Sequence, residues 1–110
     1  MPLLKIEEAG VAVLTLTEGI EEEDFFRSRL TKQEVCRQIT ILSHATLDIP
    51  AVTRDGLPEI NWQTWFAIAE HPTPDNQQLW LAISELIPTT LLWLRVYRTQ
   101  QPELFNPVSA

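Results

Sequence analysis

Glycine is scarce in this chain, with three residues in 110. Folds built from many short strands need frequent tight turns, so this scarcity disfavours a β-sandwich or barrel. Hydrophobic residues make up 45% and charged residues 21%, as is usual for a globular protein. The length suits one domain, so we predict a single all-α domain over residues 1–100. Residues 101–110 are expected to form a loosely ordered tail.

Cysteine and histidine are also rare. The single cysteine, Cys36, excludes an internal disulfide and fits a reducing, cytoplasmic compartment. The two histidines, His44 and His71, are far apart in sequence and would need carboxylates to complete a metal site. The acidic run at residues 21–24 would point to different sides of a helix rather than converge on one ion. We therefore expect no metal and no cofactor.

Basic residues are few: the chain has 8 Lys and Arg but 15 Asp and Glu, which gives a net charge of −7. An acidic protein repels phosphate backbones unless its basic residues gather on one face. Five of the eight basic residues lie between Arg27 and Arg54, so a local basic patch is conceivable. A solvated helix face is the more common outcome, and RNA is not the expected partner.

Long apolar runs suited to a membrane are missing as well. The N-terminus has no sustained apolar stretch of the kind found in a signal peptide. The most apolar segment, residues 79–94, contains Glu85 and Pro88 and is shorter than the roughly 20 residues that a membrane span needs. We expect a soluble core helix there and no membrane association.

The N-terminal half is predicted to contain a short and a long helix after an ambiguous first segment. Residues 3–19 carry both the β-branched character of a strand and a helical period, and Gly19 stands where a helix would stop. Acidic residues at 21–24 suit the first turn of a short helix. Thr31 and Glu34 have the spacing of a capping box, which predicts a helix over residues 31–47 that ends before Pro50.

The C-terminal half is predicted to contain two further helices separated by loops. Residues 50–61 are expected to form a loop, and Asn61 can cap a helix over residues 62–70. Asp75 or Asn76 can cap the last helix, which should extend to about Thr99. Pro88 lacks an amide donor, so this helix should kink or restart there. The expected fold is an antiparallel bundle of about four to five helices.

The order of these segments resembles the HepT-like family of the HEPN superfamily. Three stretches carry the resemblance: TEGIEEEDFFRSRLTKQEVCRQITILSHA at residues 17–45, GLPEINW at 56–62 and LWLAISELIPTTLLWL at 79–94. Together they span nearly the whole chain, and their order and spacing are more specific than any one of them. The resemblance implies a HEPN-like helical bundle and favours a helix over residues 3–19.

The resemblance also implies an activity whose residues are missing here. Active members of the family are dimeric ribonuclease toxins paired with a nucleotidyltransferase antitoxin, with an Arg, a short spacer, a His, one residue and a Tyr as their motif. This chain has no arginine between Arg54 and Arg95, and Thr73 stands two residues after His71. Ser43 and His44 replace the family's Gly-Glu pair, so the acidic partner of the catalytic Arg is also absent.

We therefore expect a catalytically inactive protein that acts through protein–protein interaction, as a homodimer. The alternative is a ribonuclease with relocated catalytic residues, for which the candidates are the two histidines, His44 and His71. A third hypothesis is an accessory subunit of a nucleotidyltransferase. Aromatic residues are enriched at interfaces, although they equally well fill a core. The candidate interface residues are Trp62, Trp65, Phe66, Trp80, Trp93 and Tyr97.

Overall fold

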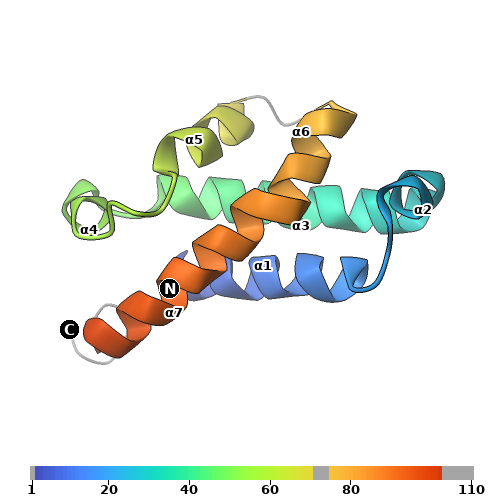
Figure 1. The fold of residues 1–110 in the computed structure, drawn as a ribbon. Coiled ribbons are helices and arrows are strands. Elements are labelled where there is room, and N and C mark those ends of the chain that lie inside the picture. The colour runs from blue at the N-terminus through green and yellow to red at the C-terminus, as the bar shows by residue number, and fades with distance from the viewer. Residues whose placement is uncertain (1, 71–74, 103–110) are drawn as a thin grey trace.

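The computed structural model describes residues 2–70 and 75–102, and every regular element in those ranges is helical. The predicted all-α helical bundle is thus confirmed, and the helices pack around one core (Figure 1). Residues 71–74 and most of the predicted tail lie outside the described residues. The elements are α1 (Pro2–Thr17), α2 (Glu22–Arg27), α3 (Arg29–Leu47), α4 (Ala51–Asp55), α5 (Trp62–Glu70), α6 (Asn76–Leu81), the π-helical η1 (Ala82–Leu86) and α7 (Ile87–Gln100).

Helices α1 and α3 form an antiparallel pair that makes up the base of the bundle (Figure 1). The ambiguous first segment is a helix because Leu3, Ile6, Ala9 and Val13 recur on one face and are all buried. Gly19 follows α1 with φ +74°, a left-handed conformation that glycine adopts without strain. The segment forms a helix despite its β-branched residues, because a helix places this apolar face against α3.

The start of α3 differs from the prediction. The helix begins at Arg29, and its N-cap is Ser28, whose hydroxyl oxygen accepts a hydrogen bond from the Thr31 amide at 3.4 Å. The expected capping box of Thr31 and Glu34 is therefore wrong, because both residues already lie inside the helix. Ser28 is also the residue that ends α2, so one serine serves both helices. The predicted end before Pro50 is correct, since α3 stops at Leu47.

We expect Ser28→Ala to lower the free energy of unfolding by about 0.5–2 kcal/mol, because the N-terminal amides of α3 lose their side-chain acceptor. Urea denaturation followed by circular dichroism measures this change. Ser84→Ala is a matched control, since the Ser84 hydroxyl donates within a helix to the Trp80 carbonyl and caps nothing. Equal effects of the two substitutions would contradict the assignment of Ser28 as the cap.

Residues 50–61 were predicted to be a loop, but they contain the short helix α4. Pro50 precedes this helix, a position at which its missing amide costs nothing. The remainder of the segment brings Leu57 and Ile60 into the core. The predicted cap of α5 is confirmed, as the Asn61 Oδ1 atom accepts from the Thr64 amide at 3.3 Å. With α4, the bundle has one short helix more than the sequence indicated.

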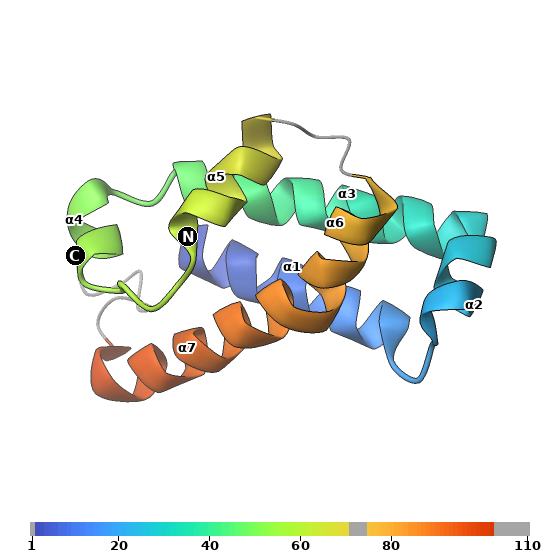
Figure 2. The ribbon, with the colours of Figure 1, turned by 45° about the horizontal axis from the view of Figure 1, so that its top comes forward.

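The last helix runs without a break through α6, η1 and α7. Of the two predicted caps, Asp75 is the one used, in a capping box with Gln78. The departure from α-helical geometry is a π-helical segment that lies just before Pro88. Because proline has no amide to donate, a wider turn ahead of it accommodates the missing bond. Figure 2 shows that the helix changes direction there, and α7 packs against α1.

This continuous helix, Asn76–Gln100, is long and apolar enough to cross a membrane by length and composition alone. Core helices of soluble proteins pass the same test. Its inner face contributes Leu79, Ile83, Ile87 and Leu94 to the core of the bundle.

Candidate functional site

The two candidate catalytic histidines are not brought together in the described part of the chain. His44 is exposed on α3 and makes no side-chain hydrogen bond or ion pair with any described residue. His71 lies outside the described residues. Among the described residues, no group of three or more His, Cys, Asp and Glu is placed to hold a metal ion. A catalytic constellation around His44 therefore has no support in the geometry.

Three of the six candidate interface aromatics belong to the core instead. Trp62, Trp65 and Tyr97 are each less than a tenth exposed. Each indole N–H has an internal acceptor, namely the Leu57 carbonyl for Trp62 and the Thr90 hydroxyl for Trp65. Large aromatic rings whose polar atoms find partners inside the protein are typical core residues. In the single chain these three side chains are therefore part of the core.

The other three aromatics are half-buried at the edge of the core. Phe66 lies beneath the Arg54 guanidinium, which is 4.9 Å from the ring centroid. Trp80 packs against both Phe25 and Phe26, and Trp93 packs against Tyr97. Each of these rings already has a partner within the chain, so the six aromatics do not form a shared exposed patch.

A groove with a volume of about 680 Å³ lies between α5 and the continuous C-terminal helix. We call it the α5–α6 groove. One wall consists of Asn61, Thr64, Ala67 and Ile68. The other wall consists of Gln78, Leu81, Ala82, Glu85, Leu86 and Thr89. The candidate interface residues chosen from the sequence do not line it.

The π-helical segment contributes to the second wall of this groove. Ala82, Glu85 and Leu86 all belong to η1. Insertion of a π turn shifts the phase of a helix, and such segments are frequent at functional sites. Beneath the groove, Trp65 Nε1 donates to Thr90 Oγ1 at 3.1 Å, and that hydroxyl donates to the Leu86 carbonyl at 2.7 Å. The bond between Trp65 and Thr90 links α5 to the C-terminal helix, in addition to the packing of α5 against α3.

A second, shallower hollow of about 460 Å³ lies at the junction of α2 and α3 and is basic. It gathers Arg27, Arg29 and Lys32 beside Phe26 and Cys36. Lys32 is already engaged, since its Nζ atom donates to Asn76 Oδ1 at 3.1 Å and lies 5.5 Å from the Phe26 ring centroid. The four acidic residues at 21–24 are next to it in sequence, so the hollow is not a purely cationic surface. Burial raises the pKa of the Cys36 thiol, which disfavours a reactive thiolate.

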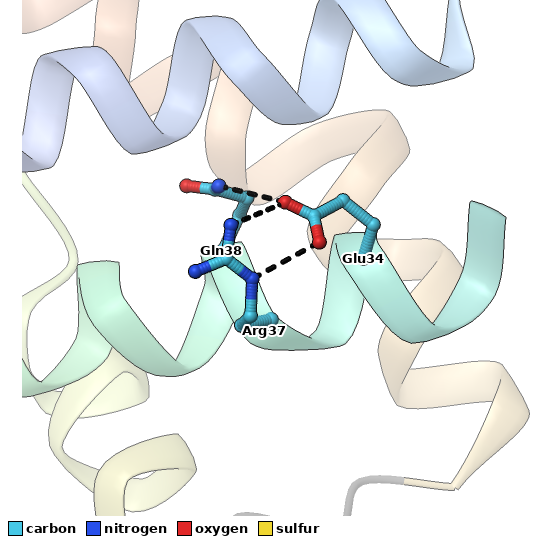
Figure 3. Close-up of polar contacts among 3 residues, drawn as sticks. All are labelled: Glu34, Arg37 and Gln38. Carbon is cyan, nitrogen blue, oxygen red and sulfur yellow. Dashed lines mark hydrogen bonds and ion pairs between the residues drawn. The ribbon is translucent and has the colours of Figure 1, made fainter. Parts of the chain in front are cut away.

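Glu34, Arg37 and Gln38 form a polar cluster on α3 (Figure 3). Arg37 donates to both carboxylate oxygens of Glu34, at 3.0 and 2.6 Å, and Gln38 donates to one of them at 3.1 Å. The hydrogen bonds from Arg37, and then that from Gln38, lower the pKa of the Glu34 carboxyl from 4.5 to about 2. The cluster is within one helix and faces solvent, so we interpret it as helix stabilisation rather than a site.

We expect the stabilisation by Glu34 to be complete above pH 4.5 and to be lost as the pH falls towards 2, because its pKa is lower in the folded chain. Arg37→Gln should raise the Glu34 pKa towards 4.5, since the principal donor is removed. A carbon-detected NMR titration of the carboxyl group measures this pKa. Arg27→Gln, at an arginine paired with Asp24, is the control and should leave it unchanged. A Glu34 pKa near 4.5 in the native protein would contradict the geometry.

Comparison with known proteins finds no match to this chain among family models, curated proteins or solved structures.

Proposed function

We propose that this chain is a non-catalytic, HepT-like helical protein that acts through protein–protein interaction. The observation that carries the proposal is the α5–α6 groove, an open hollow with apolar side chains in both walls. Interaction sites commonly consist of such exposed apolar surfaces rimmed by polar groups. The absence of the family's Arg, His and Tyr motif from the sequence supports the same conclusion.

A ribonuclease assay tests the non-catalytic part of the proposal. The purified chain and its His44→Ala and His71→Ala variants are incubated with transfer RNA and messenger RNA. We expect no cleavage above background, because the one histidine with a described position stands alone and exposed on α3. Cleavage by the native chain that is lost in His44→Ala or in His71→Ala would establish a relocated ribonuclease site instead.

We further propose that the chain forms a homodimer, as its resemblance to the HepT-like family implies. Several large apolar side chains remain on the surface of the single chain, and a second copy could cover them. They include Val11 on α1 and Leu92 on α7, which are 50% and 54% exposed. Static light scattering at micromolar concentration should give twice the mass of the 12.6 kDa chain. A monomer at that concentration would rule out the dimer.

A further inference from the structure

We infer that the α5–α6 groove binds an amphipathic, positively charged helix of another protein. The inference rests on the proposed interaction function and identifies the chemistry of the partner. It does not depend on the proposed homodimer, whose mass is measured separately.

The shape of the groove fits a helix. Its longer wall runs from Gln78 to Thr89 along one face of the C-terminal helix, with Leu81, Ala82, Glu85 and Leu86 between them at helical spacing. At 1.5 Å per residue this wall is about 16 Å long, which matches roughly three turns of a partner helix. The facing wall on α5 repeats every three to four residues as well. An amphipathic helix binds in such a groove by placing its apolar face against the apolar residues of the walls.

The groove also offers apolar surface that the bundle leaves uncovered. Leu81 is 47% exposed although it lies between the buried residues Leu79 and Ala82. Leu86 and Ile68 are only partly covered by the core, and Ala67 is exposed in the facing wall. An apolar stripe on a partner helix would remove these side chains from water, and burial of apolar area is the main source of affinity in such grooves.

The charge around the groove selects a cationic partner. Among the described residues that line the groove, Glu85 is the only ionisable one. The helices α5, α6 and η1 contain Glu70 and Glu85 but no lysine or arginine. Lys32 and Arg54, from α3 and α4, contact Asn76 and Phe66 of these helices but do not line the groove. A partner with Lys or Arg beside its apolar stripe meets complementary charge, whereas an acidic one meets repulsion. A second copy of this chain, with a net charge of −7, is therefore the poorer occupant.

A series of three synthetic helical peptides tests the inference. The peptides share one leucine stripe at positions i, i+4, i+7 and i+11, and their flanking residues are lysine, glutamine or glutamate. Fluorescence anisotropy of labelled peptides with the intact chain measures affinity. We expect the lysine peptide to bind most tightly and the glutamate peptide most weakly. A scrambled lysine peptide without the stripe should not bind, because charge alone does not fill the groove.

Paired substitutions locate the binding. Leu81→Gln should weaken the lysine peptide at least about tenfold, because it removes the most exposed apolar side chain of the wall. Leu47→Gln is the matched control, at a leucine of similar exposure that lies on α3 outside the groove, and should leave binding unchanged. Glu85→Gln should weaken the lysine peptide about two- to fivefold and leave the glutamine peptide unaffected. Circular dichroism confirms that each variant is folded.

Three results would overturn the inference. The first is no saturable binding of the lysine peptide, and the second is equal binding of the lysine and glutamate peptides. The third is binding that Leu81→Gln leaves intact, which would place the peptide elsewhere, for example on another apolar face. None of these results alters the mass found by light scattering, so failure of the groove and failure of the homodimer are distinguishable.

Discussion

Replacing Thr90 with valine is expected to lower the free energy of unfolding by about 1–3 kcal/mol. Thr90 is 2% exposed, and its hydroxyl is the acceptor for the Trp65 indole N–H. Valine keeps the branched shape but has no oxygen, so the buried N–H is left without a partner. Chemical denaturation with intrinsic tryptophan fluorescence and circular dichroism measures the loss.

A double-mutant cycle separates this hydrogen bond from other effects at Thr90. In a Trp65→Phe background no indole N–H remains, so Thr90→Val should cost distinctly less there. Thr99→Val is the control at the surface, since Thr99 is exposed and its hydroxyl donates only to the Arg95 carbonyl. The same cost for Thr90→Val in both backgrounds would mean that the hydrogen bond between α5 and α7 contributes nothing.

Replacing Gly10 with valine is expected to destabilise the fold by about 1–3 kcal/mol through overpacking. A Cβ atom at Gly10 would lie 2.9 Å from Leu91 Cδ2 and 3.2 Å from Leu91 Cγ. Valine is a better helix former than glycine, so at an open position the change would be neutral or stabilising. The expected loss therefore reports the close approach of α1 and α7. Thermal and urea denaturation measure it.

Truncation of the opposing side chain provides the matching test. Leu91→Ala opens space at the contact and costs stability by itself, because Leu91 packs against the core. The double variant Gly10→Val with Leu91→Ala should be more stable than the sum of the two single changes predicts. Strict additivity would indicate that α1 and α7 do not meet at Gly10.

A helix could be predicted from the sequence where its apolar stripe and its capping residue indicated the same boundaries. The α5 boundaries followed from Asn61 and the apolar stripe behind it, and the structure confirms both. At α3 the sequence pointed to Thr31 as the cap, whereas the cap in the structure is Ser28. Ser28 is also the C-cap of α2, a role that the spacing of Thr31 and Glu34 does not reveal.

The candidate site was predicted less well because its residues are conspicuous only in the folded chain. Trp62 and Trp65 are interface candidates by residue type, yet both indole rings are buried. Their N–H groups donate to acceptors inside the protein, one in the loop after α4 and one on α7. The α5–α6 groove consists of ordinary residues such as Ala67 and Gln78, which come together only when α5 and the C-terminal helix are folded. Leu81 is the one sequence signal for the groove, because this apolar residue lies beside the core-facing stripe of the helix rather than within it.

The most direct test of the central claim is an NMR titration of the isotopically labelled chain with the lysine-flanked peptide. We expect the amide shifts to cluster in the two walls of the groove, around Thr64, Ile68, Leu81 and Glu85. Shifts confined to the basic hollow of Arg27, Arg29 and Lys32, or no shifts at saturating peptide, would contradict the claim that this bundle acts through the α5–α6 groove.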